Sequence, residues 1–301
     1  MPWFRWWRRR EADAAPTRTR TTRPIYVPGR EGVMTGESHY LAPNDIQETD
    51  RLNLQHMALR EQFGTNCFAP VQHPTRILDA ASGTGRWAKE VAQQFLNAQV
   101  TGIDASVPLE IQEQGPASDY TFRQANVLEP LPFPDESFDY THMRLMTGAM
   151  PAQKWPEVVR ELVRVTTKGG WVELVEAYLP IDGGPALKQL EGWGQQLVTG
   201  RGIDMTLGSH VGEFLRAAGA VDITERNEFL PVGPYGGRVG QLIGMDLMTG
   251  FRAASPVLAQ GLGLNEEAVK ETLQRIDAEI YGGQHQVRMP IYIAFGQRPV
   301  A

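Results

Sequence analysis

The sequence predicts an α/β fold with a doubly wound, mostly parallel sheet, and three observations support this prediction. Between residues 76 and 178, short runs rich in β-forming residues alternate with helical runs, which is typical of βαβ units. After residue 178, two helical stretches precede a β-like run, "VDITERNEFL", and the chain closes with "MPIYIAFGQ". A Gly-rich and Met-rich insertion at about 233–283 separates these runs, so we expect an antiparallel last strand with a helical insertion before it.

The elements follow in order from the periodicity of apolar residues. The stretch "NDIQETDRLNLQHMALREQFG" predicts a helical N-terminal segment before the sheet. Further on, "TTKGGW" follows a strongly periodic helix, and Gly169 and Gly170 are expected to end that helix as a C-cap turn. The predicted strands are 76–80, 99–103, 119–125, 138–143 and 170–177, followed by the two late runs, and the predicted helices are about 85–96, 106–114, 153–166, 186–199 and 208–218.

Length, composition and cysteine content limit the class of protein. A chain of 301 residues, 42% of them hydrophobic, can bury one sizeable core and one small accessory unit. The formal charge of -6 argues against a surface built for nucleic acid. Cys67 is the single cysteine and no apolar run is long enough to span a bilayer, so we expect a cytoplasmic protein.

The N-terminus differs in character from the rest of the chain. Residues 1–30 contain eight arginines against two acids, and "MPWFRWWRRR" places aromatic residues beside them. We expect residues 1–36 to be a basic, disordered tail. The alternative is weak contact with an anionic membrane surface, with tryptophans at the headgroups and arginines on phosphates. Residues 37–70 are then expected to form a helical lid, and 71–301 the main domain with the insertion.

Residues 77–88, "ILDAASGTGRWA", combine an apolar run, a Gly-rich turn and the first turn of a helix. This order forms a nucleotide cradle, because the N–H groups of the first helical turn point at the ligand. Gly83-x-Gly85-x-x-Ala88, with Asp104 about 20 residues on, also fits a dinucleotide fingerprint. However, Asp79 ends the strand four residues before the glycines, and no second nucleotide fingerprint follows. A nicotinamide-dependent oxidoreductase is therefore the weaker interpretation.

The layout resembles the class I S-adenosylmethionine-dependent methyltransferases. Their first motif, D-x-G-x-G-x-G, is matched by Asp79, Ala81, Gly83 and Gly85, with Ala81 in place of the first glycine. The stretches "LPFPDESFD" and "KGGWVELVE" match later family signatures. Over about residues 37–180 the chain is similar to the LaeA-like branch, which includes fungal secondary-metabolism regulators. The resemblance implies a Rossmann-like seven-stranded sheet and S-adenosyl-L-methionine as the cofactor.

The resemblance also implies roles for the cofactor-binding residues. Gly83 and Gly85 let the backbone approach the methionine part of the cofactor, while Asp79 organises the loop or binds the ammonium. Asp104, at the end of "VTGIDAS" with Ala105, would accept the ribose hydroxyls. Asn126 falls where an acid often lies beside the adenine amino group, and an amide oxygen accepts the same hydrogen bond. Val127 would offer its backbone N–H to the ring.

The stretch "FDYTHMRLM" carries the candidates for chemistry. The N/D-P-P-Y box of enzymes that methylate amides and exocyclic base amines is absent there, so DNA adenine and protein glutamine are poor substrate candidates. His142 takes its place, either as a general base or as a hydrogen-bonding residue for the cofactor carboxylate or the neighbouring loop. Arg144 is a candidate for binding a carboxylate.

The segment "GESHYLAPNDIQETDRLNLQH" is expected to close over the cofactor through Tyr40, Arg51 and His56. The alternative is a helix packed on the sheet edge with Leu52 and Leu59 as core, and both can hold together.

The sequence thus predicts a methyltransferase that acts on an O, N or C nucleophile of a small molecule, in line with a role in secondary metabolism. No nucleic-acid partner and no metal are expected, because the six histidines are scattered and only one cysteine is present. The alternative is a cofactor-binding regulator that transfers little or no methyl.

Overall fold

The computed structural model describes residues 25–26, 33–34, 45–108 and 120–301. Tyr40 and most of the helix expected at 106–114 lie outside these residues. Strand β1 (Ile25–Tyr26) pairs antiparallel with β2 (Val33–Met34), inside the segment expected to be a tail. The disorder expected for residues 1–36 stays a prediction.

Seven strands form the main sheet, as the sequence predicts. Strand β9 is antiparallel to both of its neighbours, and all other neighbouring pairs are parallel. The doubly wound α/β fold with an antiparallel last strand is therefore confirmed. The spatial order is β5 (Tyr120–Gln124), β4 (Gln99–Asp104), β3 (Arg76–Ala80), β6 (Phe138–Arg144), β7 (Thr166–Ala177), β9 (Arg288–Gln297) and β8 (Val221–Pro231).

The order of the strands defines where a ligand can bind. From β3 the chain proceeds outward through β4 to β5, and then crosses back to β6 on the other side of β3. The connections thus change direction between β3 and β6. In open α/β sheets, ligands bind outside the carboxyl ends of the strands at such a switch point.

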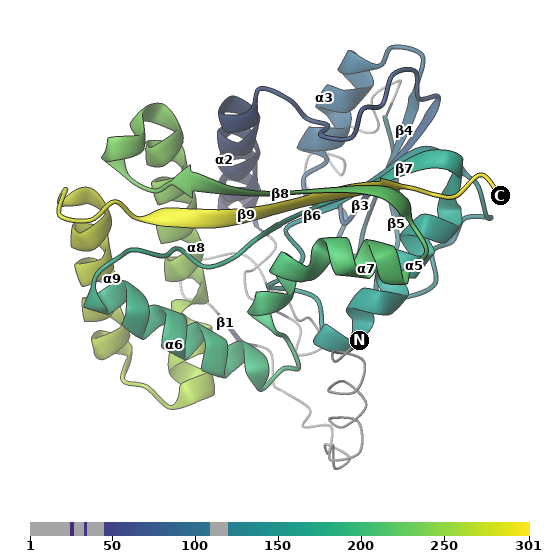
Figure 1. Ribbon diagram of the computed structural model, residues 1–301. Helices are drawn as coiled ribbons and strands as arrows, with labels where there is room; N and C mark the ends of the chain where they lie inside the picture. Colours follow the sequence, from purple (N-terminus) through teal and green to yellow (C-terminus); the bar gives the residue numbers. More distant parts are fainter. Residues whose placement is uncertain (1–24, 27–32, 35–44, 109–119) are drawn as a thin grey trace.

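Helices cover both faces of the sheet (Figure 1). Helices α2 and α3 lie above the sheet in this view, α5 and α7 lie below it, and α6, α8 and α9 gather at one end of it. No helix among the described residues is long and apolar enough to cross a membrane. The helices are α2 (Ile46–Phe63), α3 (Arg86–Gln94), α5 (Trp155–Val165), α6 (Pro185–Thr199), α7 (Val211–Ala217), α8 (Gly237–Leu262) and α9 (Glu266–Tyr281).

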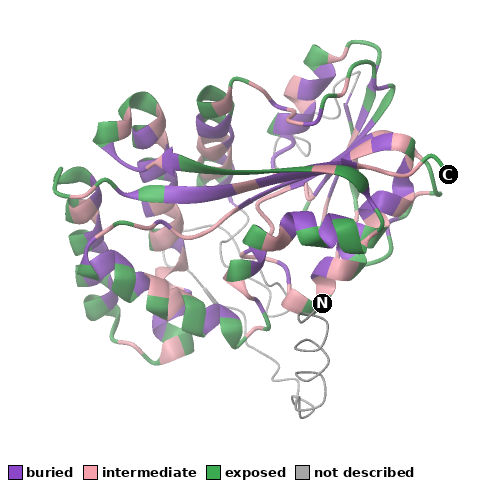
Figure 2. Cartoon of the chain, in the orientation of Figure 1, coloured by how far each residue is buried: buried purple, intermediate pink, exposed green. Residues whose placement is uncertain are grey.

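Side-chain alternation along the central strands builds a core on each face. Ile77 belongs to the cluster that contains Trp87 of α3, while its neighbour Leu78 belongs to the cluster that contains Leu162 of α5. Figure 2 shows the resulting buried layer along the strands and on the inner sides of the helices. The central strands are therefore buried on both faces, as a parallel sheet requires.

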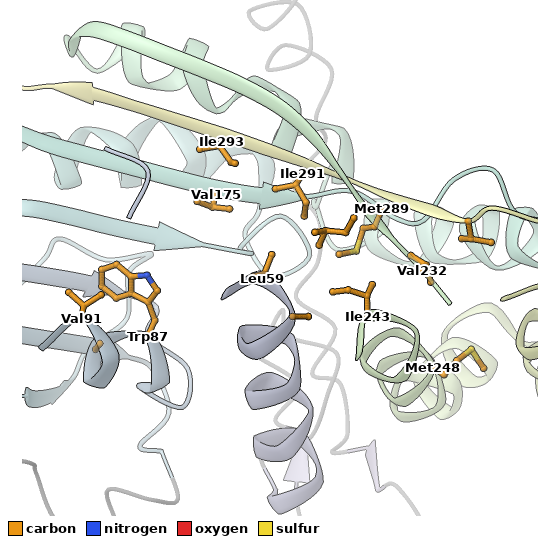
Figure 3. Close-up of a cluster of buried hydrophobic side chains, with 14 of the residues drawn as sticks. Leu59, Trp87, Val91, Val175, Val232, Ile243, Met248, Met289, Ile291 and Ile293 are labelled. Carbon is orange, nitrogen blue, oxygen red and sulfur yellow. The ribbon is translucent and has the colours of Figure 1, made fainter. Parts of the chain in front are cut away.

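The N-terminal helix and the insertion share one of these cores. Helix α2 begins where the Asp45 side chain accepts from the Glu48 N–H, and ends at Gly64 in the left-handed conformation. The insertion forms α8 and α9 between β8 and β9, where a helical insertion was predicted. In Figure 3, Leu59 of α2 and Ile243 of α8 both point toward Ile291 of β9.

One boundary differs from the prediction. The helix that begins at Trp155 ends at Val165, and Gly169 and Gly170 lie inside β7 instead of forming its C-cap. The pairing of β7 with β6 shifts register between Phe138 and Tyr140, so these glycines form a bulge in the ladder. Gly169 has a φ of 75°, which suits such an irregularity.

Candidate active site

The turn after β3 is built from residues with left-handed backbone. Ala81, Gly83 and Gly85 have φ values of 58°, 55° and 73°, and Gly85 is the N-cap of α3. A Cβ at Gly85 would lie 2.6 Å from the Tyr120 hydroxyl, so glycine is required there by contact as well as by φ. There is more space at Gly83, where a Cβ would lie 3.7 Å from Leu52 of α2. The turn thus leaves its backbone accessible at Gly83.

Asp104 fixes this turn from the end of β4. Its Oδ2 accepts from the Gly83 N–H at 3.0 Å and its Oδ1 accepts from the Ser106 N–H at 2.9 Å. Burial raises the pKa of Asp104, and these two N–H groups oppose that rise. A carboxylate has about four acceptor sites, so two remain for ligand hydroxyls. Ala105, next to it, is exposed.

Asp79 and His142 form a buried pair across β3 and β6. They are direct cross-strand neighbours, and His142 Nδ1 lies 2.9 Å from Asp79 Oδ1. The His142 ring stacks on Trp87 of α3, with centroids 3.8 Å apart and an interplanar angle of 5°. Asp79 is 2% exposed, and its Oδ2 has no hydrogen-bond partner among the described residues. A buried carboxylate oxygen without a donor indicates a site for a cationic ligand group.

The surroundings of His142 bear on its two predicted roles. The side chain is 1% exposed, one ring face is covered by Trp87, and Nδ1 is bonded to Asp79. A base that takes a proton from a substrate must reach it within hydrogen-bond distance. The geometry therefore favours the hydrogen-bonding role of His142, as the residue that orients Asp79.

Arg144 ends β6 and is linked to α2. Its Nη2 donates to His56 Nδ1 at 2.9 Å, and His56 Nε2 lies 3.0 Å from Glu90 Oε2 of α3. Burial and the nearby Arg144 charge lower the pKa of His56 to about 4. The imidazole is therefore neutral near pH 7, with Nδ1 accepting from Arg144. His56 thus joins α2, β6 and α3, and its predicted cofactor contact remains a prediction.

Arg51 lies between α2 and α8. Its guanidinium donates to Glu48 and to Asp246 of α8, at 2.6 Å in each case. Asp246 is 1% exposed and also accepts from Gln55. These bonds place Arg51 at the contact between α2 and α8, and its predicted role at the cofactor remains a prediction. Tyr40, the third residue predicted for the lid, lies outside the described residues.

Helix α2 does lie against the glycine turn. Thr84 Oγ1 donates to Asn53 Oδ1 at 2.9 Å, and Leu52 faces Gly83. The alternative of a packed helix also holds, because Leu59 is 6% exposed in the core. The position of α2 is thus compatible with the expected cover over the site.

Asn126 and Val127 follow the end of β5. Asn126 is exposed, and its Oδ1 accepts from the Leu128 N–H at 3.0 Å, which closes a local turn. Val127 is 4% exposed and its side chain belongs to a hydrophobic cluster. Their predicted contacts with adenine remain predictions.

Sequence reasoning missed two buried acids on β7. Glu173 Oε2 accepts from the Phe68 and Ala69 N–H groups, and Glu173 is the cross-strand neighbour of His142. Burial raises the pKa of Glu173, while the charge of His142 opposes that rise. Glu176, the second acid, is also fully buried. The signal was present in "WVELVEA", where two acids interrupt a strand that is otherwise apolar.

These residues fit S-adenosylmethionine. The oxygen of Asp79 that lacks a donor suits its ammonium, the Asp104 carboxylate suits its ribose hydroxyls, and the open backbone at Gly83 suits its methionine chain. All three belong to strands or turns beside the switch point between β3 and β6. The polar groups of the site therefore suit the cofactor that the sequence implies.

Comparisons with known proteins show similarity to methyltransferases. Residues 77–170 match the methyltransferase domain family. The chain is 34% identical over 155 residues to methyltransferase str3 of Strobilurus tenacellus, covering 49% of this chain and 53% of that protein. It is 27% identical over 276 residues to N-methyltransferase sirN of Leptosphaeria maculans, covering 87% and 96%. Secondary metabolism regulator LAE1 of Cochliobolus heterostrophus is 28% identical over 235 residues, covering 71% and 74%.

The fold and the site fit those of a class I S-adenosylmethionine-dependent methyltransferase, and residues 77–170 match the methyltransferase domain family. The chain is also similar to a secondary metabolism regulator of the LaeA-like branch, LAE1. The chain spans about half the length of str3 but nearly all of sirN.

Proposed function

We propose that this chain transfers a methyl group from S-adenosylmethionine to an O, N or C nucleophile of a small molecule of secondary metabolism, in the cytoplasm. The observation that carries the proposal is the buried Asp79 carboxylate, which has one oxygen on His142 and the other without a donor at the switch point. The similarity to sirN along 276 residues supports the same conclusion. Relatives named as secondary metabolism regulators support the metabolic setting.

The chain's own residues divide the work of binding and orientation. Asp79 binds the ammonium and Asp104 the ribose, with Asn126 and Val127 at the adenine. When bound, the cofactor supplies a methyl group activated by its sulfonium. Because the leaving group is good, the main contributions of the protein are alignment of the acceptor and exclusion of water. Helix α2 serves the second purpose by covering the glycine turn.

Arg144 is the residue we assign to a carboxylate. It is half-buried, and its Nη2 is bonded to neutral His56, which leaves further N–H groups of the guanidinium for an anion. Burial lowers the pKa of Arg144, and the charges of Asp79, Glu90 and Glu173 oppose this effect. The carboxylate of the cofactor or of an acidic acceptor is a suitable ligand.

A second candidate function is regulation by a cofactor-bound form that transfers little methyl. The similarity to LAE1, over 74% of that protein, supports this second function.

Incubation with methyl-labelled cofactor and a small-molecule cell extract, followed by identification of labelled products, distinguishes the two functions. We expect a labelled small molecule that disappears with Asp104→Ala and persists with Glu271→Ala, an exposed acid on α9. Intact binding of S-adenosylhomocysteine without any labelled product would favour the regulator.

A further inference from the structure

The residue that follows β6 has an unusual backbone. Leu145 has a φ of 58°, and only four other non-glycine residues among those described have a positive φ. A bulky side chain rarely adopts this conformation. Ala81, directly after β3, shares it, so the two strands that flank the switch point both end in a left-handed residue. Such strain gathers at functional sites and persists only where the surroundings enforce it.

Residues of β7 hold the backbone after Leu145 in place. The Leu145 N–H donates to the Val175 carbonyl at 2.8 Å. The next two N–H groups, of Met146 and Thr147, each donate at 2.9 Å to one oxygen of the Glu176 carboxylate. The Thr147 hydroxyl donates to the same carboxylate at 2.6 Å. Successive backbone N–H groups that converge in this way form an anion-binding concavity, and here the anion is a side chain of the protein itself.

This arrangement is sealed from solvent. Glu176 is 0% exposed and Thr147 is 2% exposed. A Cβ at Gly208 would lie 2.8 Å from Thr147 Oγ1 and 3.2 Å from Glu176 Cβ, so the short helix η2 (Met205–His210) packs directly over the pair. Because hydrogen bonds of a buried carboxylate are not replaced by water there, Glu176 determines the path of the loop.

The loop held by Glu176 borders the methyl-transfer site. Residues 145–150 begin directly after Arg144, at the carboxyl end of β6 and beside the turn after β3. This is the end of the sheet where ligands bind in the fold. An acceptor aligned with the cofactor would therefore contact this loop.

We propose that Glu176 is a positioning residue for methyl transfer, which holds the backbone N–H groups of Met146 and Thr147 and so fixes the loop against which the acceptor is aligned. The proposal rests on the function proposed above. Misplacement of the acceptor slows transfer without loosening the cofactor, because the predicted ammonium and ribose ligands, Asp79 and Asp104, lie on β3 and β4.

Glu176→Gln tests this directly, because the amide keeps the shape but offers one oxygen to two N–H groups. We expect kcat to fall at least 10-fold while the Kd for S-adenosylhomocysteine changes less than about 3-fold. Hydrogen exchange at the Met146 and Thr147 amides should accelerate at least 10-fold. Thr272→Val on α9 is the control, since it removes a buried hydroxyl bond to the Ala268 carbonyl away from the loop and should change kcat less than about 3-fold.

A second variant separates a loss of positioning from a folding defect. Glycine takes the left-handed backbone without strain, so Leu145→Gly combined with Glu176→Gln should fold and recover part of the lost kcat. Equal losses of kcat and cofactor affinity, or unchanged amide exchange in Glu176→Gln, would overturn the positioning role. If the wild-type protein binds S-adenosylhomocysteine but methylates nothing, the proposed function fails, and the amide exchange still reports whether Glu176 holds the loop.

Discussion

At the scale of single residues, the site departs from its family motif at Ala81. The structure gives Ala81 a φ of 58°, in the left-handed region where the family has glycine. This conformation costs an alanine on the order of 1–2 kcal/mol. The motif could be recognised from the sequence despite the substitution, but the strain became visible only with the backbone.

Replacing Ala81 with glycine should stabilise the protein. We expect Ala81→Gly to raise the free energy of unfolding by up to about 1 kcal/mol, because relief of strain exceeds the added entropy of the unfolded chain. Ala80→Gly is the matched control: Ala80 is buried in β3, so this change should lower stability. Denaturant unfolding of both variants measures the effect, and a destabilised Ala81→Gly would contradict the account.

His142 gives a second prediction at this scale. If it orients Asp79, His142→Ala should weaken binding of S-adenosylhomocysteine as well as slow turnover, since the Asp79 carboxylate loses its donor. A general base acts only on the way to the transition state, so its loss would lower kcat with affinity unchanged. Calorimetry and initial rates on the same preparation separate these outcomes.

Glu176 gives a third prediction, in the pH dependence of stability. Burial raises the pKa of Glu176 from 4.5 to about 7. The folded state thus holds this proton more tightly than the unfolded state, so its stabilising contribution is complete below about pH 4.5 and is lost as the pH rises through 7. The loss is at most about 3 kcal/mol.

Chemical denaturation between pH 5 and pH 8 measures this contribution. Other groups titrate in the same range, so the comparison is with Glu176→Gln, which cannot ionise. The unfolding free energy of the wild type should decline relative to that of the variant as the pH rises. Parallel curves would show that Glu176 does not titrate in this window.

At the scale of elements, an ion-pair network joins the N-terminal helix to the insertion. Arg51 of α2 binds Asp246 of α8, and both Asp246 and Glu48 are buried. Sequence periodicity predicted both helices but not their contact, because it joins residues 195 positions apart.

Removing Arg51 should be severe. Arg51→Ala leaves the buried Asp246 carboxylate without the cation that it binds, and we expect a loss of about 3–5 kcal/mol of stability. The chain offers a matched control between the same two helices, since Arg238 of α8 pairs with Glu61 of α2 at the surface. Arg238→Ala should cost less than about 1 kcal/mol. Similar losses in the two variants would refute a special role for the buried network.

At the scale of the whole molecule, the topology was predictable and the fine structure of the site was not. Alternating strands and helices, the hairpin with its insertion and the glycine turn all follow from local patterns. The Asp79 and His142 pair depends on the register of β3 and β6, and the Glu176 contact depends on a loop from another strand. Both arise from tertiary packing between distant segments, which no local pattern encodes.

The central claim is that S-adenosylmethionine binds at the switch point between β3 and β6, and calorimetric titration with S-adenosylhomocysteine tests it most directly. We predict saturable binding by the purified protein, weakened by roughly 1.5–3 kcal/mol in Asp104→Ala, the scale of hydrogen bonds to a charged group. Glu271→Ala, remote on α9, should bind as the wild type does. Tight binding of NADH with no response to S-adenosylhomocysteine would contradict the account.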